Sequence, residues 1–273
     1  MQKVGVNLEI DQVLDKLIKS ELITYCCQIF KKDEAKFLPF GSSVLSILGG
    51  NYFLLTASHV IEYLSKGHLF FRTKNGYATI TGMVHETDII KSQGIDIAFV
   101  KLDTEVIKLM LGGYRFLPIS KFMGHNNLFD AGQYCVIGFP ESNIKIDGGK
   151  LMTGASAYFV KPSSEKTYDY YGIKKEIQYA MEFKGKGTDL ETGKIKKNKA
   201  SHYGLSGCGL WIVFIWQEKG QYFADFRLIG IMTEFRKGKY HCLIGNKIVL
   251  MLKGIKRLEG LQYIEKPVKY QSD

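Results

Sequence analysis

The stretch Gly204-Leu205-Ser206-Gly207-Cys208-Gly209-Leu210-Trp211 governs the interpretation of the whole chain, because glycines surround a single serine. Glycine allows the backbone to adopt positive φ and to bring its N–H groups close to a bound group. A tight turn with converging N–H groups and an exposed hydroxyl can supply a nucleophile together with an oxyanion hole. Taken alone, the stretch also fits an ordinary glycine-rich hairpin loop, so other parts of the chain must decide between these interpretations.

Two further stretches carry a histidine and an aspartate. In the stretch Phe53–Val60, large apolar residues are followed by Thr-Ala-Ser-His. A histidine just past the end of a strand, with small residues before it, can hold its ring over a cleft. Asp96 opens an apolar run and has isoleucine on both sides, so its carboxylate is expected to be partly buried and to need a donor or a charged partner. Each residue alone also fits a structural role, His59 as a satisfied histidine and Asp96 as the cap of a turn or strand.

The order of these residues favours a catalytic interpretation. His59, Asp96 and Ser206 follow one another in the order of the chymotrypsin-type triad. Their surroundings, Thr-Ala-Ser-His, Asp-Ile-Ala and Gly-Leu-Ser-Gly, are similar to that family's Thr-Ala-Ala-His, Asp-Ile-Ala and Gly-Asp-Ser-Gly. Weaker matches lie at residues 41–44, 136–140 and 228–232. The sequence therefore resembles the trypsin-like (chymotrypsin-fold) serine peptidases, in particular those of the cytosolic bacterial type.

The resemblance implies an all-β fold of two six-stranded antiparallel β-barrels, with a short N-terminal helix, a C-terminal helix and the active site in the cleft between the barrels. His59 and Asp96 would come from the first barrel and Ser206 from the second. Ser206 would attack a peptide carbonyl, His59 would accept its proton, and Asp96 would orient the imidazole. The N–H groups of Gly204 and Ser206 would receive the oxyanion. The implied activity is that of a serine endopeptidase that forms an acyl-enzyme and requires neither a cofactor nor a metal.

The same resemblance places further residues at the substrate. Ala200 stands where the family has the base of its primary pocket, and without a carboxylate there a preference for Lys or Arg has no support. Thr233 and Glu234 belong to the run 232–235, which could pair with the backbone of an extended peptide. His202 and Glu234 could contact the substrate, although a solvated surface role fits each of them as well. The expected preference before the cut is a small or medium-sized apolar side chain.

Leu205 and Cys208 depart from the family pattern. Where the digestive branch has an aspartate that pairs with a newly freed N-terminus, this chain has Leu205, so activation by N-terminal cleavage is not implied. If the enzyme is kept inactive in the cell, a misformed oxyanion loop is the expected latch, because Leu205 cannot form that ion pair. Cys208 stands where the family usually has glycine, and a small thiol is expected to fit there.

The hydrophobic pattern divides the chain into a helical segment over residues 1–21, a first barrel over 22–115, a second barrel over 116–245 and a C-terminal helix with a tail over 246–273. Ile10, Val13, Leu14, Leu17 and Ile18 have the spacing of an amphipathic helix, which braces the domain behind it or docks a partner. Short runs rich in β-branched and aromatic residues follow, beginning with Leu22–Phe30, and favour an antiparallel barrel or sandwich. Short helices are expected at Ser58–Leu64 and Asn246–Ile255, and a long surface loop in the second half of Ser163–Lys199.

Charge and cysteine content narrow the classes of function. The 273 residues include 37 basic and 27 acidic side chains, a net charge of +10, but the lysines are dispersed, and the clusters at residues 194–199 and 253–257 lack interleaved aromatics. Nucleic-acid binding is therefore the less favoured explanation of the charge. The 5 cysteines show no metal-ligand spacing and are expected to be reduced and buried. No secretory signal and no membrane-length apolar run are visible, so a cytoplasmic location is expected.

Two alternatives to an active peptidase are left open. The first is a catalytically silent peptidase fold that serves as a binding or scaffolding module, although the intact trio favours catalysis. The second is a nucleic-acid-binding protein, which only the net charge suggests. Within the peptidase interpretation, the resemblance to cytosolic bacterial members suggests a proteolytic effector in stress or phage defence. Its substrate would be a protein or peptide, and a regulatory protein partner would control it.

Overall fold

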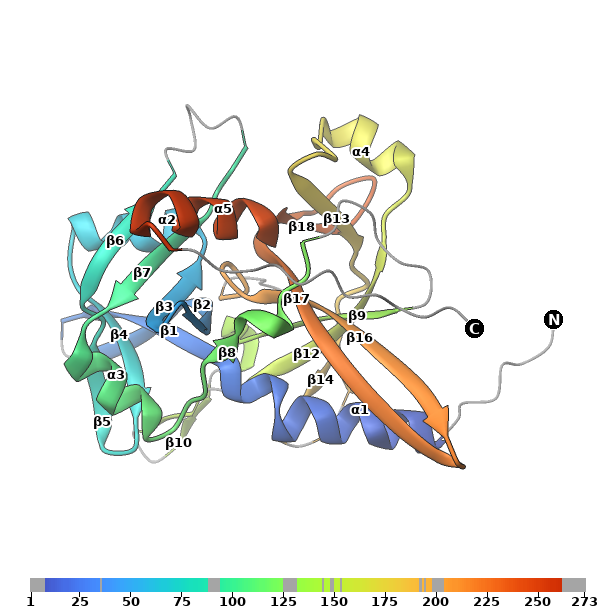
Figure 1. The fold of residues 1–273 in the computed structure, drawn as a ribbon, viewed down its shortest axis with the longest axis horizontal. Coiled ribbons are helices and arrows are strands. Elements are labelled where there is room, and N and C mark those ends of the chain that lie inside the picture. Colours follow the sequence, from blue (N-terminus) through green and yellow to red (C-terminus); the bar gives the residue numbers. More distant parts are fainter. Residues whose placement is uncertain are drawn as a thin grey trace.

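Two curled β-sheets and several short helices make up the protein in the computed structural model (Figure 1). The structure describes residues 8–34, 36–87, 94–124, 132–143, 145–147, 150–152, 154–191, 193, 195–197 and 204–261. Figure 1 shows the first sheet at the left in blue and cyan, and the second at the right in green, yellow and orange. Within the described ranges, no helix has the length and apolar character needed to cross a membrane.

The first sheet uses the strands before residue 119. They are β1 (Cys26–Asp33), β2 (Lys36–Leu48), β3 (Asn51–Thr56), β4 (Leu69–Thr73), β5 (Gly76–Thr79), β6 (Gly82–Glu86), β7 (Ala98–Leu102) and β8 (Leu117–Pro118). The antiparallel path runs β5-β4-β1-β2-β3-β7-β6, and β8 pairs in parallel with β2. Fully buried side chains, including Ile29, Leu45 and Phe71, fill the interior of this sheet. The expected curled sheet is confirmed, with eight strands where six were expected.

The second sheet closes on itself. Its strands are β9 (Gln133–Gly138), β12 (Ser156–Pro162), β13 (Gln178–Glu182), β14 (Lys186–Asp189), β15 (Ile195–Lys197), β16 (Gly209–Glu218), β17 (Gln221–Arg236) and β18 (Cys242–Lys247). They follow the order β13-β18-β17-β16-β9-β12-β14-β15, and a further pairing of β13 with β12 closes the first six into a ring. A separate hairpin consists of β10 (Lys145–Asp147) and β11 (Lys150–Met152).

One expectation about this region is wrong. The second half of residues 163–199 was expected to be a long surface loop, but β14 joins the sheet through β12, and β15 pairs with β14. These two strands lie at the outer end of the sheet, beyond the closed ring. Strands that face water on one side need few apolar residues, so a lysine-rich sequence can form them without an obvious hydrophobic signal.

Short helices cover the ends and the seam of the two sheets. They are α1 (Leu8–Ser20), α2 (Ser58–Ile61), α3 (Thr104–Leu111), α4 (Glu165–Tyr171) and α5 (Ile248–Glu259). Figure 1 shows α1 along the β16–β17 hairpin, and the buried side chains Leu14 and Ile18 contribute to the core there, as expected of a brace. The strand expected over Leu22–Phe30 starts only at Cys26, because Leu22–Tyr25 form a 3₁₀ turn.

One apolar cluster joins the two sheets and fixes their relative position. It contains Val44 and Phe99 of the first sheet with Ile137 and Trp211 of the second, and side chains of α1 and α5 pack around them. Burial of each such side chain stabilises the fold by roughly 1.5–3 kcal/mol relative to exposure. Loops at the seam of the sheets are therefore held in a defined position relative to each other.

The cysteines are structural. All five are free and buried, as the sequence predicts. Burial raises the pKa of the Cys27 and Cys135 thiols to about 12. Because the thiolate is the reactive form, these side chains are inert at neutral pH. Cys208, which stands at the family's glycine position, is 1% exposed, and burial raises its thiol pKa as well.

Candidate active site

His59 stands where β3 gives way to α2. The apolar strand ends at Thr56, and Ser58 and His59 open the short helix. Ser58 Oγ accepts a hydrogen bond from the N–H of Thr87 at 2.9 Å and lies 3.1 Å from the carbonyl O of Ile97. The start of α2 is therefore tied directly to the segment that carries Asp96.

Asp96 holds His59 at two points. Its Oδ2 lies 2.7 Å from Nδ1 of the imidazole, and its Oδ1 accepts the backbone N–H of His59 at 3.1 Å. The side chain of Asp96 is 15% exposed and that of His59 is 38% exposed, so the carboxylate lies deeper than the ring. An ionised carboxylate at Nδ1 selects the tautomer that carries its proton there, which leaves Nε2 of the neutral ring as an acceptor.

The second sheet holds Asp96 in place from the other side. The backbone N–H of Asp96 donates to Oδ1 of Asn246 at 2.9 Å, and Nδ2 of Asn246 donates to the carbonyl O of Gly94 at 3.2 Å. Gln178 Nε2 also donates to that carbonyl, at 3.1 Å. Asn246 is fully buried at the end of β18. Asn246 does not stand out in the sequence as a site residue, because its partners lie far away along the chain.

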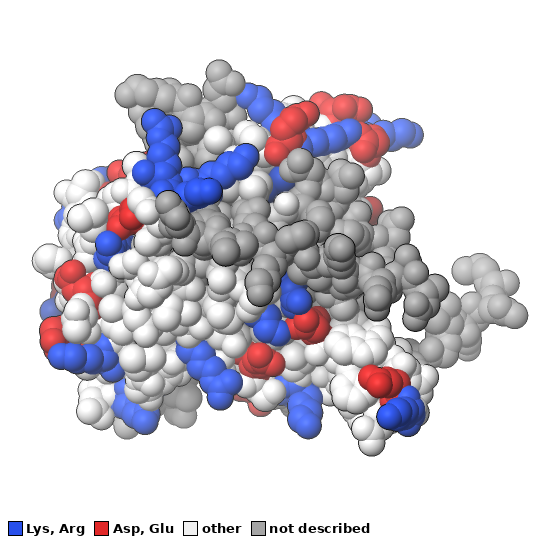
Figure 2. All heavy atoms as spheres, in the orientation of Figure 1, with Lys and Arg blue, Asp and Glu red and all other residues white. Residues whose placement is uncertain are grey.

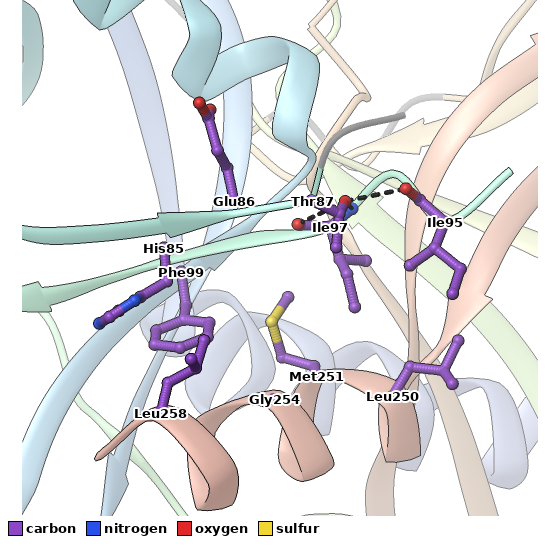
Figure 3. A pocket seen from close by; sticks show the side chains of 10 residues that line it. All are labelled: His85, Glu86, Thr87, Ile95, Ile97, Phe99, Leu250, Met251, Gly254 and Leu258. Carbon is purple, nitrogen blue, oxygen red and sulfur yellow. Dashed lines mark hydrogen bonds between the residues drawn. The ribbon is translucent and has the colours of Figure 1, made fainter. Parts of the chain in front are cut away.

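An apolar pocket lies between the Asp96 segment and α5 (Figure 3). It has a volume of about 170 Å³, and Ile95 and Ile97, the neighbours of Asp96, line it opposite Leu250 and Met251 of the helix. Of the described residues that line this pocket, none is His59, Asp96 or Ser206. The pocket is therefore separate from the candidate triad, and its walls support the segment from which Asp96 projects.

The loop that carries Ser206 is bound to both sheets. The N–H of Gly207 donates to the carbonyl O of Met232 at 2.7 Å, within the second sheet. The N–H of Ser42, in the first sheet, donates to the carbonyl O of Ser206 at 2.8 Å. Gly207 also packs against Thr56, at the end of the strand that leads into His59. The structure thus brings the Ser206 loop to the start of the His59 helix.

Ser206 itself is only lightly held. Its Oγ donates to the carbonyl O of Thr233 over a long 3.5 Å, and among the described residues it forms no hydrogen bond with His59. The N–H groups of Gly204 and Ser206 donate to no acceptor within the described part of the chain. Gly204 adopts φ +91°, a conformation that other residues rarely take.

Gly207 is expected to tolerate no side chain. Its φ is +86°, and a Cβ there would overlap Thr56 Oγ1 and the carbonyl O of Ser42. Gly207→Ala should lower the free energy of unfolding by about 3 kcal/mol or more, from backbone strain and overpacking together. Gly220→Ala is the matched control, because Gly220 has φ +78° but no atom near its Cβ position. Urea unfolding of both variants separates the two effects, and equal losses would contradict the packing argument.

The charges around His59 favour its protonated form. Burial alone lowers the pKa of the imidazole, but the hydrogen bond and the charge of Asp96 outweigh it, and Glu62 and Glu234 add to them. The pKa of His59 is consequently raised above its ordinary value of 6.5. A group that gains a proton more readily is well suited to accept one from a nucleophile.

Of the four residues expected to contact the substrate, the structure describes Thr233 and Glu234. Thr233 is 6% exposed, and the ladder between β17 and β18 is irregular between Met232 and Glu234. Glu234 is half-exposed and forms an ion pair with Arg236 at 2.9 Å. The pairing of β17 with β16 ends at Ile231, so the next residues of β17 pair with β18 alone. Ala200 and His202 lie outside the described residues.

Known proteins resemble this chain in fold, although not in overall sequence. No protein-family model matches the sequence, and no curated protein matches it either. A solved structure described as "Structure of GrC" is similar at a TM-score of 0.52 and 14% identity, over 88% of this chain and 95% of that chain. Another, described as a thermostable serine protease AL20 from an extremophilic microorganism, has a TM-score of 0.49 and 11% identity, over 88% and 98% of the two chains.

The closed second sheet, the curled first sheet and the similarity to the GrC structure define a chymotrypsin-like double β-barrel. The fold class expected from the sequence is therefore confirmed. At such low sequence identity the similarity shows the fold alone.

Proposed function

We propose that this protein is a serine endopeptidase in which His59, Asp96 and Ser206 form the catalytic triad. The observation that carries the proposal is the two-point contact of Asp96 with His59, at 2.7 and 3.1 Å, next to a loop that presents Ser206. A partly buried carboxylate that fixes one imidazole tautomer is what a general base needs to act on a hydroxyl. The double β-barrel supports the proposal, because its two sheets supply the two halves of this site.

In the proposed reaction, Ser206 Oγ attacks the carbonyl carbon of the scissile peptide bond while its proton passes to Nε2 of His59. The carbonyl oxygen becomes an oxyanion, which the N–H groups of Gly204 and Ser206 stabilise. His59 then gives the proton to the leaving nitrogen, the C–N bond breaks, and an acyl-enzyme remains on Ser206. Water, activated by the same imidazole, releases the acid and restores the serine.

The substrate proposed for this site is an extended peptide. Glu234 and Phe235 of β17 pair with β18 on one side, and β16 has no residue opposite them on the other. An edge of this kind can accept a peptide backbone by strand addition. Glu234 belongs to that edge, so it and Thr233 stay our candidates for substrate contact. Ala200, which the sequence resemblance assigns to the base of the primary pocket, lies outside the described residues and stays a prediction.

The proposal is tested with a fluorophosphonate probe. Ser206 Oγ would attack the phosphorus, fluoride would leave, and a stable Ser206–phosphorus bond would form that mass spectrometry of the intact protein and of its peptides detects. A stoichiometric adduct on Ser206 supports an assembled triad. A folded protein that gains no adduct contradicts the proposed activity and favours the alternative of a scaffolding module.

The rate of this labelling should rise with pH, with a midpoint above 6.5. The neutral form of His59 accepts the proton, and the pKa of His59 is raised, so the active fraction appears only as the pH climbs through that raised value. Glu62→Gln removes one of the charges responsible and should move the midpoint to lower pH. Glu105→Gln, on the exposed face of α3, is the control and should leave it unchanged. An upward shift for Glu62→Gln would contradict the argument.

The wider role proposed for the enzyme rests on the sequence resemblance. The free, buried state of all five cysteines supports a reducing compartment such as the cytoplasm. On the described part of the face shown in Figure 2, Lys and Arg lie at several separate places, with one group at the upper left, and several of them lie beside Asp or Glu. The preference for a protein or peptide substrate over nucleic acid stays a prediction from the sequence. A role in bacterial stress or phage defence, with a regulatory protein partner, stays a prediction.

A further inference from the structure

Ser42 is a buried serine whose polar groups all converge on the seam of the two barrels. It lies in β2 and has no exposed surface. Its Oγ donates to the carbonyl O of Gly204 at 2.5 Å and accepts the N–H of Phe139 at 3.2 Å. Its own N–H donates to the carbonyl O of Ser206 at 2.8 Å, and its carbonyl O accepts the hydroxyl of Thr56 at 2.8 Å.

The segment Gly204–Ser206 is therefore attached at both ends to one residue. The hydroxyl of Ser42 holds the Gly204 carbonyl, and the N–H of Ser42 holds the Ser206 carbonyl. The backbone attachment would survive any substitution at position 42 except proline, but the attachment at Gly204 depends on the side chain. The contact with Ser206 is thus one that almost any residue at position 42 could make, whereas the contact with Gly204 requires the serine hydroxyl.

The attachment at Gly204 matters because glycine is the residue least able to hold its own conformation. Without a Cβ, Gly204 can adopt positive or negative φ at similar cost, and it stands at +91° here. The angles φ and ψ of Gly204 fix the direction of its N–H relative to its carbonyl. The carbonyl of Gly204 and the N–H of Leu205 belong to one planar peptide unit, so the hydrogen bond from Ser42 fixes that plane and limits the directions that remain open to the N–H of Gly204.

We propose that the Ser42 hydroxyl is a positioning group that orders the oxyanion loop from the opposite barrel. This inference rests on the proposed peptidase function and deepens it. Leu205, which is 2% exposed and packs against Gly138, anchors the middle of the same segment by burial. The hydrogen bond from Ser42 and the burial of Leu205 thus hold this loop. They take the place of the aspartate that the digestive branch has at the position of Leu205. The oxyanion site is formed without a newly generated N-terminus.

The test compares the rate of fluorophosphonate labelling in Ser42→Ala and Ser43→Ala. Ser43 is the adjacent residue of the same strand, is equally buried, and donates its hydroxyl to the carbonyl O of Cys27 at 3.1 Å, away from the loop. Ser43→Ala leaves one buried carbonyl without its hydroxyl donor, whereas Ser42→Ala removes the donor to the Gly204 carbonyl and also the acceptor of the Phe139 N–H, so Ser42→Ala should lose more thermal stability than Ser43→Ala. Only Ser42→Ala should slow labelling, by about 10- to 100-fold, less than the 10²–10³ typical of losing an oxyanion donor outright.

A second readout separates positioning from general damage. Because the contact between His59 and Asp96 is untouched, the pH midpoint of labelling in Ser42→Ala should equal that of the unmodified protein while the rate falls. If Ser42→Ala does not fold, Ser42→Thr keeps the hydroxyl and Ser42→Cys replaces it with a weak donor, so Thr should label faster than Cys.

The outcomes distinguish this inference from the proposed function. Labelling of the unmodified protein together with a selective loss in Ser42→Ala supports the positioning role. Labelling of the unmodified protein with equal rates in Ser42→Ala and Ser43→Ala overturns the role of Ser42 and leaves the triad standing. If the unmodified protein is not labelled, the proposed function fails, and the role of Ser42 fails with it.

Discussion

Ser206→Ala is expected to abolish fluorophosphonate labelling, and to reduce the hydrolysis of any cleaved peptide by about 10⁶-fold, while the fold stays intact. The reaction has no other nucleophile in the proposed mechanism, so no residual adduct should form. The hydroxyl of Ser206 contributes little to stability, because its one hydrogen bond among the described residues is 3.5 Å long. The free energy of unfolding should therefore fall by no more than about 1 kcal/mol.

The measurement pairs intact mass spectrometry with urea unfolding, and Ser65→Ala serves as the control. Ser65 is an exposed serine that donates only to the carbonyl O of Glu62, so its variant should be labelled like the unmodified protein. His59→Ala combined with Ser206→Ala should be no slower than either single variant, because members of one catalytic unit are not additive. An adduct on Ser206→Ala, or a loss of stability above about 3 kcal/mol, would show that Ser206 has a structural role instead.

The members of the candidate triad can be proposed from the sequence because each of them lies in a short local pattern. The apolar run before His59 indicates that this residue follows a buried strand, and the isoleucines beside Asp96 indicate that its carboxylate is partly buried. The glycines around Ser206 indicate a loop that only glycine can form, and Gly204 and Gly207 do adopt positive φ. Local patterns of this kind can be recognised in a single sequence without knowledge of the rest of the fold.

The contacts that assemble the site leave no such local trace. Ser42 and Gly204 are 162 positions apart along the chain, and Asp96 and Asn246 are 150 positions apart. Ser42 lies in one of the weaker family matches, at residues 41–44, but that match does not indicate its contact with Gly204. Asn246 is predicted from the sequence only as the first residue of a short helix, whereas it lies in β18. Their significance follows only from the closure of two barrels against each other, which a single sequence does not display.

The errors in secondary structure have a similar origin. α4 buries only Thr167 and Tyr168, so the polar stretch 165–171 lacks the apolar stripe that indicates a helix. The outer strands β14 and β15 lack the alternating pattern of a core strand. The hydrophobic pattern thus misses elements whose residues are mostly polar, whereas strands such as β3 and β16 are predicted from their runs of apolar residues.

Asp96→Asn is expected to slow labelling and hydrolysis by about 10⁴-fold, with little change in fold. An asparagine amide can donate to Nδ1 of His59, which selects the tautomer whose proton sits on Nε2. In that tautomer Nε2 cannot accept the proton of Ser206, and the charge that stabilises the imidazolium is lost as well. The hydrogen bond from the backbone of residue 96 to Asn246 does not depend on the side chain, so the segment should keep its position.

Asp225→Asn is the matched control, because it should lower stability without changing the rate of labelling. Asp225 accepts hydrogen bonds from Lys121 at 2.6 Å and Arg227 at 2.5 Å, and these contacts hold the pKa of its carboxyl below the ordinary value despite partial burial. Its substitution should cost about 1 kcal/mol of stability and leave labelling unchanged. Asp96→Asn should do the reverse, which separates a carboxylate used for chemistry from one used for folding. If Asp96→Asn were labelled at the normal rate, Asp96 would be a structural cap of the His59 helix and the proposed triad would be wrong.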